Sequence, residues 1–176
     1  MNMKMKEIYF AGGCFWGTEK VFKSCPGVKS TTVGYANGHT ENPTYHEVCT
    51  DTTGHRETVK VEYDPKEISL EKLLQVFFLV IDPKVKNRQG NDWGSQYQTG
   101  VYYSDPEEKL LLEAVFEEKK RNIHPFCVEL SPLKHFWPAE EYHQDYLDKN
   151  PGGYCHISST EMAEVKDLFI VEETGE

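Results

Sequence analysis

The chain has 176 residues, 38% of them hydrophobic and 27% charged, which predicts a single globular domain over residues 1–176. Its formal net charge of −10 argues against a nucleic-acid-binding face, because the tight basic run Lys119, Lys120 and Arg121 fits the C-terminus of a helix. The sequence shows neither a secretory signal nor a run of roughly 20 apolar residues that could span a membrane, so we expect a cytoplasmic protein.

Strand and helix patterns alternate along the first part of the chain. In order, we predict a strand over Glu7–Phe10, a helix over Phe15–Lys23, a strand over Lys29–Tyr35, a loop over Asn37–Thr44 and a strand over Glu57–Tyr63. The last strand alternates, with Val59, Val61 and Tyr63 on one side, as a half-buried strand does.

The second part begins with a clear helix over Ser69–Ile81, whose apolar residues repeat at helical spacing and which Ser69 can cap. There follow, in order, a polar loop over Asn87–Gln98, a strand over Gly100–Tyr103, a helix that opens at Asp105, a strand over Phe126–Leu130 and a short helix over Ala139–Lys149. Asp105 as the cap, Pro106 at the first helical position and Glu108 at the third form a capping-box arrangement.

This order of elements predicts an α+β fold. Strand, helix, strand, strand, helix and strand follow one another, and a further helix and strand come after them. The order resembles a two-layer, ferredoxin-like split β-α-β sandwich with a long C-terminal extension.

Five cysteines are present, namely Cys14, Cys25, Cys49, Cys127 and Cys155. An odd, widely spaced set is not typical of a disulfide framework, and no Cys-x-x-Cys pair is available for a zinc ribbon or a thioredoxin-type motif. We interpret Cys25, Cys49 and Cys127 as structural, because Cys49 lies in an apolar context beside Val48 and Cys127 alternates within a strand pattern.

Cys14 stands between a predicted strand with two glycines and the start of a predicted helix. Free N–H groups and positive potential at a helix N-terminus favour thiolate over thiol, which makes a cysteine nucleophilic. A small buried core cysteine is the alternative. Phe15 and Trp16 follow directly and can wall a pocket for a small apolar group, or simply pack in the core.

Further polar residues carry potential chemistry. Glu57 opens a strand, where an enclosed carboxyl becomes an acid near neutral pH and an exposed one has no such role. Tyr45 and Tyr97 are phenols on predicted polar loops that can donate hydrogen bonds, and Asp92 can orient a polar partner or cap a turn. Cys155 follows a glycine-rich segment flexible enough to bring a second thiol to Cys14, although it can also be a surface cysteine without function.

Taken together, these stretches resemble the A-type methionine sulfoxide reductases over about Glu7 to Ile157. The motifs that carry the resemblance are Gly13-Cys14-Phe15-Trp16-Gly17, Val33-Gly34-Tyr35-Ala36, Asn42-Pro43-Thr44-Tyr45-His46-Glu47-Val48-Cys49, Thr53-Gly54-His55-Arg56-Glu57, Asn87-Arg88-Gln89-Gly90-Asn91-Asp92, Gly94-Ser95-Gln96-Tyr97, Phe136-Trp137-Pro138-Ala139-Glu140-Glu141-Tyr142-His143-Gln144 and Asn150-Pro151-Gly152-Gly153-Tyr154-Cys155.

The resemblance implies reduction of methionine-S-sulfoxide, in proteins and as the free amino acid, and hence repair of oxidative damage. It implies Cys14 as the nucleophile, Phe15 and Trp16 as the binding site of the substrate methyl, Glu57 as the proton donor, Tyr45 and Tyr97 as hydrogen-bond donors to the sulfoxide oxygen, Asp92 as a residue that arranges the site, and Cys155 as the resolving thiol.

The implied cycle leaves Cys14 as a sulfenic acid, which condenses with Cys155 to a disulfide that thioredoxin or another external dithiol reduces. No metal or organic cofactor is expected, and we expect a monomer. Two positions depart from the family pattern: Ile81 stands where histidine is expected and Gln98 where arginine is frequent. Neither has one of the chemical roles above, so both affect only local packing or loop contacts.

Three other functions remain as alternatives. A cysteine hydrolase needs a histidine base beside Cys14, for which the candidates are His39, His46, His55, His135 and His143. A metal-binding module lacks the usual paired ligand motifs, and a non-enzymatic interaction domain predicts no turnover of methionine sulfoxide.

Overall fold

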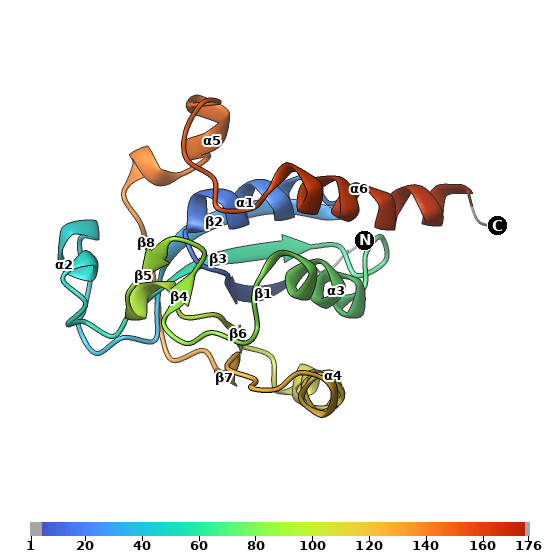
Figure 1. Cartoon of the computed structure of the whole chain (residues 1–176), viewed down its shortest axis with the longest axis horizontal. Coiled ribbons are helices and arrows are strands. Elements are labelled where there is room, and N and C mark those ends of the chain that lie inside the picture. Colours follow the sequence, from blue (N-terminus) through green and yellow to red (C-terminus); the bar gives the residue numbers. More distant parts are fainter. Residues whose placement is uncertain (1–4, 175–176) are drawn as a thin grey trace.

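The computed structural model describes residues 5–174. Within this range six strands form one mixed sheet in the order β7-β6-β1-β3-β2-β8. These strands are β1 (Lys6–Ala11), β2 (Val28–Ala36), β3 (Arg56–Tyr63), β6 (Gly100–Tyr103), β7 (Glu129–Pro132) and β8 (Phe136–Pro138). Neighbouring strands run antiparallel except for the parallel pair β6 and β7. The molecule therefore has a mixed α/β fold around a mostly antiparallel central sheet (Figure 1).

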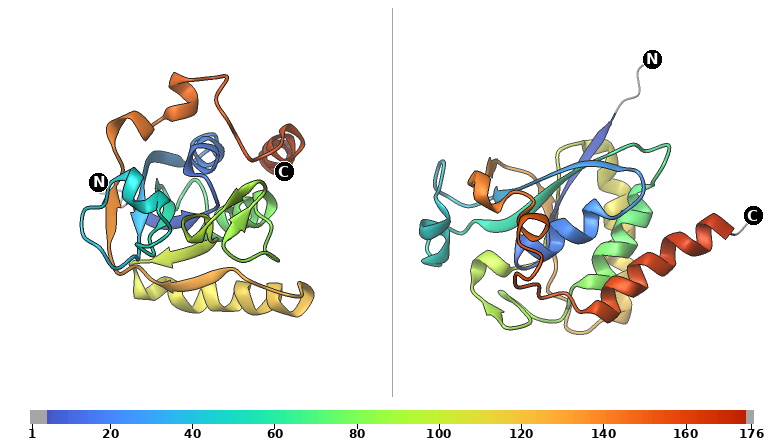
Figure 2. Two further views of the ribbon diagram at one scale, coloured as in Figure 1. Left: turned by 60° about the vertical axis from the view of Figure 1, so that its left-hand side comes forward. Right: turned by 90° about the horizontal axis from the view of Figure 1, so that it is seen from above.

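Helices α1 (Phe15–Lys23) and α3 (Leu70–Val80) cover one face of this sheet (Figures 1 and 2). Phe10 of β1 joins them, because its ring stacks on Phe22 of α1 at 4.5 Å and on Phe77 of α3 at 5.2 Å. The adjacent Tyr9 points to the opposite face and contacts Phe136 at 5.2 Å between ring centres. This alternation of successive side chains decides which residues of each strand can face the helices.

The predicted strands at β1, β2, β3 and β6 and the predicted helices at α1 and α3 are confirmed within one residue at each end. Ser69 caps α3 by accepting a hydrogen bond from the Lys72 amide at 3.0 Å. Helix α4 (Lys109–Asn122) lies along the β7 edge of the sheet (Figure 1) and ends in the basic run predicted for a helix C-terminus.

The capping box predicted at Asp105 is wrong in one half. Asp105 accepts a hydrogen bond from the Glu107 amide at 2.9 Å and caps a short 3-10 turn, η2 (Pro106–Glu108), ahead of α4. The Glu108 carboxylate does not return to the cap, because its Oε2 accepts a hydrogen bond from the Tyr63 hydroxyl at 3.1 Å. A tertiary partner thus replaces the local one.

Three predicted boundaries need correction. The predicted loop over residues 87–98 contains a small hairpin, β4 (Arg88–Gln89) with β5 (Asp92–Trp93), and a 3-10 turn, η1 (Ser95–Tyr97). The strand predicted over 126–130 is instead β7, since pairing with β6 begins where Gly100 meets Glu129. The helix predicted over 139–149 is broken into η3 (Glu141–His143) and α5 (Tyr146–Lys149).

The break comes at Asp145, which has a left-handed φ of 56°. Its amide donates a hydrogen bond to Glu19 Oε1 of α1 at 2.9 Å, which ties α5 to α1. The Asp145 amide makes this tertiary hydrogen bond in place of a hydrogen bond within a helix. Local sequence patterns carry no information about a partner this distant in the chain.

Beyond these, α2 (Tyr45–Cys49), β8 and α6 (Ser159–Thr174) were not predicted. Tyr45 therefore opens a short helix rather than lying on a loop, and Thr44 and Glu47 form a complete capping box before it. Helix α6 lies beside α3 (Figures 1 and 2). In the described part of the chain, no helix combines the length and apolar character that crossing a membrane requires.

Candidate active site

The turn between β1 and α1 presents Cys14 at the very start of the helix. Gly13 has a φ of +90°, and a β-carbon there would lie 2.8 Å from the β-carbon of Gln89, so both backbone and space demand glycine. Cys14 is the N-cap of α1, and the backbone N–H groups of Trp16 and Gly17 interact with its sulfur. The predicted position at a helix N-terminus is therefore confirmed.

The predicted thiolate does not fit the surroundings of Cys14. Cys14 is only 7% exposed. Burial raises its pKa well above the ordinary thiol value, and the Glu57 carboxylate raises it further, against the lowering effect of the Trp16 and Gly17 amides. The helix terminus thus acts in the expected direction, but loss of solvent and a nearby acid outweigh it.

Glu57 is buried because it continues the side of β3 that faces the helices, together with Val59, Val61 and Tyr63. Its Oε1 accepts a hydrogen bond from the Phe15 amide at 3.1 Å, while its buried Oε2 has no hydrogen-bond partner among the described residues. Burial raises the pKa of Glu57 to about 8, to which the Asp92 charge contributes. The exposed-glutamate alternative is therefore wrong, and the carboxyl is mainly un-ionised at neutral pH.

Phe15 and Trp16 differ in their surroundings. Phe15 is 1% exposed and lies 5.7 Å from Tyr35 between ring centres, within the core. Trp16 is partly exposed, stacks on Tyr146 at 3.8 Å, and donates its indole N–H to Nδ1 of His143 at 3.0 Å. One face and the edge of the indole are thus fixed by the segment that follows β8.

Two phenols on different elements interact electrostatically with Glu57. Tyr45 stands at the start of α2 and Tyr97 at the end of η1. Burial raises the pKa of each phenol, and the Glu57 charge is the next cause for both. Both therefore remain protonated hydrogen-bond donors at neutral pH.

Glu140 fixes α2 against the sheet. One of its carboxylate oxygens accepts a hydrogen bond from the Tyr45 amide at 2.8 Å, and the other accepts one from the Tyr35 hydroxyl, also at 2.8 Å. Since Tyr35 lies opposite Glu57 in the β2–β3 pairing, this carboxylate connects Tyr45 to the strand pair that carries the candidate acid.

The segment around Cys155 lies on the β1–α1 turn. Its sulfur is 2.9 Å from the position that a β-carbon would take at Gly17, and His156 Nε2 is 2.8 Å from the Gly12 carbonyl oxygen. The Tyr154 hydroxyl donates to Oδ2 of Asp92 at 3.1 Å. Tertiary structure therefore places the second thiol beside the helical turn that begins at Cys14.

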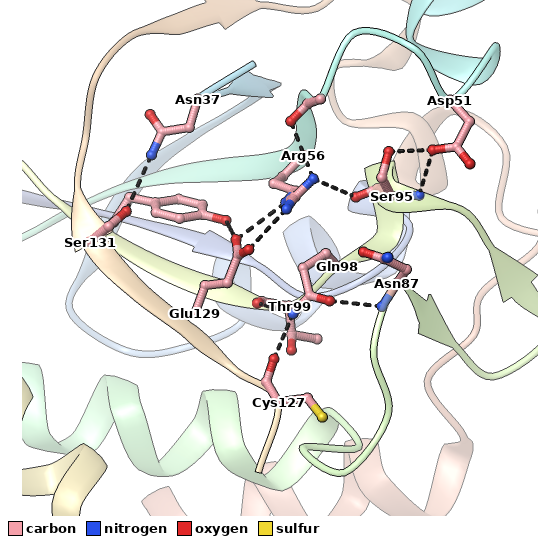
Figure 3. A network of polar contacts seen from close by, with 12 residues as sticks. Asn37, Asp51, Arg56, Asn87, Ser95, Gln98, Thr99, Cys127, Glu129 and Ser131 are labelled. Atoms are coloured by element: carbon pink, nitrogen blue, oxygen red, sulfur yellow. Dashed lines mark hydrogen bonds and ion pairs between the residues drawn. The ribbon is translucent and has the colours of Figure 1, made fainter. Parts of the chain in front are cut away.

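A polar network on the opposite side of β3 supports the site (Figure 3). Arg56 makes a two-pronged ion pair with Glu129, at 3.2 Å from Nε and 2.9 Å from Nη2, and the Tyr102 hydroxyl donates to the same carboxylate at 2.8 Å. Arg56 also donates to the Gly54 and Ser95 carbonyl oxygens, both at 3.2 Å. This guanidinium connects the strand of Glu57 to the turn of Tyr97.

The two departures from the family pattern have local roles. Ile81 is 7% exposed and lies in the main core. Gln98 accepts a hydrogen bond from the Asn87 amide at 2.7 Å and donates to the carbonyl oxygens of Thr99 and Cys127 at 2.9 and 2.6 Å (Figure 3). Gln98 thus closes the base of the loop that carries Asp92 and Tyr97.

The remaining cysteines have different environments. Cys25 is 2% exposed, and burial raises its pKa to about 12, as expected of a structural residue. Cys127 is partly exposed and donates weakly to the Lys84 carbonyl oxygen at 3.5 Å. Cys49 is exposed at the end of α2, so its assignment to an apolar environment is wrong.

Three histidines considered as hydrolase bases have other partners. His55 accepts a hydrogen bond from the Gly38 amide at 3.1 Å and contacts Thr40, and His135 contacts the Gly38 carbonyl oxygen at 2.8 Å. His143 accepts from Trp16. Across residues 5–174 no group of three or more His, Cys, Asp or Glu residues is placed to hold a metal ion.

Several residues of this site were assigned no role in sulfoxide reduction from the sequence, namely Tyr35, Glu140, His143, Tyr146, Tyr154 and His156, although His143 was a candidate base for the hydrolase alternative. Glu140 and His143 fall inside a stretch that matches the family. The match marks these two positions but does not indicate what their side chains contact. The contact of Tyr146 with Trp16 and that of Tyr154 with Asp92 join positions more than sixty residues apart, so spacing alone gives no indication of them.

Comparison with known proteins adds independent evidence. The family model described as peptide methionine sulfoxide reductase matches residues 6–172. The peptide methionine sulfoxide reductase MsrA of Clostridium acetobutylicum is 56% identical over 154 residues, which cover 87% of this chain and 95% of that protein. The protein of the same name from Lachnoclostridium phytofermentans is 52% identical over 163 residues, covering 92% and 98%.

Solved structures agree. Reduced Mxr1 from Saccharomyces cerevisiae is similar with a TM-score of 0.83 at 37% identity, covering 88% of this chain and 92% of that one. Mxr1 in complex with Trx2 is similar with a TM-score of 0.59 at 27% identity, covering 81% and 85%.

Proposed function

Because the chain belongs to the peptide methionine sulfoxide reductase family, it reduces methionine sulfoxide to methionine, and we propose that Cys14 is the residue that becomes oxidised. The observation that carries this assignment is the protonated Glu57 carboxyl, with a pKa of about 8, enclosed next to the thiol at the start of α1. A sulfoxide sulfur is a poor electrophile until its oxygen is protonated or strongly hydrogen-bonded, and this pocket supplies such donors.

The site residues divide the task of binding. Trp16, fixed by His143 and Tyr146, and Phe15 offer an apolar wall to the substrate methyl group. Tyr45 and Tyr97 remain protonated and donate to the sulfoxide oxygen, while Asp92 is held by Tyr154 at the rim. We propose that this arrangement accepts the S-epimer, in peptides and as the free amino acid.

The first step reduces the sulfoxide sulfur and oxidises the sulfur of Cys14. Glu57 Oε2, which has no hydrogen-bond partner among the described residues, protonates the sulfoxide oxygen, and the resulting carboxylate takes the proton of the Cys14 thiol as its sulfur attacks. A bond forms between the Cys14 sulfur and the substrate sulfur. The protonated Glu57 gives its proton to the hydroxyl on the substrate sulfur, so that the substrate sulfur–oxygen bond breaks and water leaves. Water then attacks the Cys14 sulfur and gives a proton to the Glu57 carboxylate, the sulfur–sulfur bond breaks, methionine leaves, Cys14 carries a sulfenic acid, and Glu57 is protonated again. The raised pKa of Cys14 fits this coupling, because the thiol keeps its proton until the attack and can then pass it to the Glu57 carboxylate.

The second step uses Cys155, whose sulfur already lies beside Gly17. Its thiolate attacks the sulfenic sulfur, the oxygen leaves as water, and a Cys14–Cys155 disulfide forms. We propose a thioredoxin as the external dithiol that reduces the disulfide, supported by the similarity to Mxr1 bound to Trx2.

We further propose that residues 1–176 act as one domain, monomeric and cytoplasmic, without a metal or organic cofactor. The sheet order β6-β1-β3-β2 with α1 and α3 on one face supports describing the core as a ferredoxin-like split β-α-β layer. On this description, the chain after β6 forms the C-terminal extension that brings Cys155 back to α1.

Turnover of the two methionine sulfoxide epimers by four proteins tests the function. Wild type should reduce the S-epimer alone, and Cys14→Ser should abolish the reaction. Cys155→Ser should release about one methionine per protein and then stop unless another thiol substitutes. Glu57→Gln should slow the first step far more than it weakens binding. Full activity of Cys14→Ser would refute the assignment.

A further inference from the structure

His156 has one ring nitrogen engaged and one that lacks a partner. Its Nε2 lies 2.8 Å from the Gly12 carbonyl oxygen, which can only accept, so Nε2 carries the hydrogen. In a neutral ring the lone pair is then on Nδ1, which is buried and has no hydrogen-bond partner among the described residues. A basic nitrogen is therefore held in the protein interior without an assigned use.

This free nitrogen lies beside the Cys155 sulfur, on the first turn of α1. Nδ1 is 3.2 Å from the position of a β-carbon at Gly17, and the sulfur of Cys155 is 2.9 Å from the same point. Gly17 in turn supplies one of the amides that interact with the sulfur of Cys14. The Cys155 thiol donates to the Ile157 carbonyl oxygen over a weak 3.5 Å contact, so little hydrogen-bond energy is lost when this thiol takes another acceptor.

We propose that Nδ1 of His156 accepts the proton of the Cys155 thiol when this thiol attacks the sulfenic acid on Cys14. The proposal rests on the function proposed above and concerns its second step alone. The S–H bond of Cys155 and the S–O bond of Cys14 break, and the disulfide forms. The oxygen leaves with its hydrogen, takes the proton from His156 and departs as water, so no external oxidant or reductant is needed.

The surroundings of the imidazole suit a transient proton acceptor. Burial lowers the pKa of His156 below its ordinary value of 6.5, so the ring is neutral and able to accept at pH 7. Opposing this, the Gly12 carbonyl, Asp92 on β5 and Glu161 on α6 raise the pKa, so that a proton arriving on the ring is partly stabilised. Tyr154, on the same segment, is a further titratable group and interacts electrostatically with both Cys14 and Cys155.

The test is a single turnover by His156→Gln, whose amide N–H can keep the hydrogen bond to Gly12 but which offers no basic nitrogen. Methionine release, sulfenic acid trapped with dimedone, and loss of both thiols are followed by rapid quenching and mass spectrometry. His124→Gln is the matched control, because His124 is exposed and its Nε2 also contacts a carbonyl oxygen, that of Arg121 at 3.2 Å.

With His156→Gln, methionine release should persist while disulfide formation slows by about tenfold or more at pH 7, because an unassisted thiol is only a few per cent ionised there. Sulfenic acid should accumulate, and the difference from wild type should vanish above about pH 9, where thiols ionise unaided. A purely structural role would leave a defect at all pH values, and that result, or disulfide formation at the wild-type rate, would overturn the proposal. Failure of the proposed function itself would differ, since no protein would then release methionine.

Discussion

The sulfur of Cys155 lies 2.9 Å from the point that a β-carbon at Gly17 would occupy. Normal van der Waals contact between such atoms needs a longer separation, so the absence of a side chain at Gly17 is what lets the second thiol approach the first turn of α1. Gly17 is therefore expected to govern the step that joins the two sulfurs rather than the step that removes oxygen.

Gly17→Ala is predicted to keep the first release of methionine and to slow disulfide formation by about tenfold. The position is helical, and alanine favours a helix over glycine by about 1 kcal/mol, which opposes any loss of stability from the displaced Cys155 segment. Gly152→Ala is the control, because nothing lies within 4 Å of a β-carbon there. Equal disulfide rates in the two variants would contradict this role of Gly17.

The pH dependence of sulfoxide reduction should reflect Glu57. Because its pKa is about 8, the acid form is present at neutral pH and is lost as the pH rises through that value, so the rate of methionine release should fall above about pH 8. Glu57→Gln should remove this inflection and lower the rate by about a hundredfold or more. Single-turnover rates across the pH range provide the measurement. Glu62→Gln, on the other side of the same strand, should keep the wild-type profile.

The same carboxyl should also lower the stability of the protein at neutral pH. The pKa of Glu57 is raised above the unfolded value near 4.3, so its contribution to stability is present below that pH and is lost as the pH rises toward 8. Glu57→Gln is therefore expected to be more stable than wild type at pH 7 by up to about 3 kcal/mol, and similar to it near pH 4. Urea unfolding at both pH values measures this, and an unchanged difference between them would argue against the raised pKa.

Arg56 is predicted to position Tyr97. Arg56→Lys loses the two-pronged pair with Glu129 and the hydrogen bond to the Ser95 carbonyl oxygen. Stability should fall by about 1–2 kcal/mol, since Glu129 is 40% exposed and its charge is partly screened, and the turnover number should fall a few-fold. Thermal unfolding and steady-state rates are the measurements. Lys29→Met, which removes the exposed pair of Lys29 with Glu67, should change neither.

The Cys14 thiol offers a further check on the coupling between the two groups. The Glu57 carboxylate is the second cause of the raised pKa of Cys14, after burial. Glu57→Gln should therefore lower the pKa of this thiol and speed its alkylation at pH 8, even though the variant is a poor reductase. Slower alkylation than in wild type would show that the two groups do not interact. The variant Cys14→Ser identifies the signal that belongs to this residue.

The sequence by itself determined those features whose causes lie close together in the chain. The glycines before Cys14 and the helical pattern after it place this residue at a helix N-terminus, and Ser69 caps its helix as predicted. The alternation of Val59, Val61 and Tyr63, extended by one step, places Glu57 on the buried side of β3, although the sequence analysis had left an exposed glutamate open. The family motifs identified the reaction for the same reason. Each motif is a short run of consecutive residues, so it can be recognised without knowledge of the fold.

Only the tertiary structure decided the properties that depend on distant neighbours. Burial and a carboxylate 43 positions away reverse the expected ionisation of Cys14, and a hydrogen bond from Asp145 to Glu19 breaks a helix that local propensity favours. The approach of Cys155 to Gly17 likewise joins residues 138 positions apart in the sequence. Charge, solvent exclusion and close contact act through space, so their effects on these residues follow from the fold and not from the order of residues along the chain.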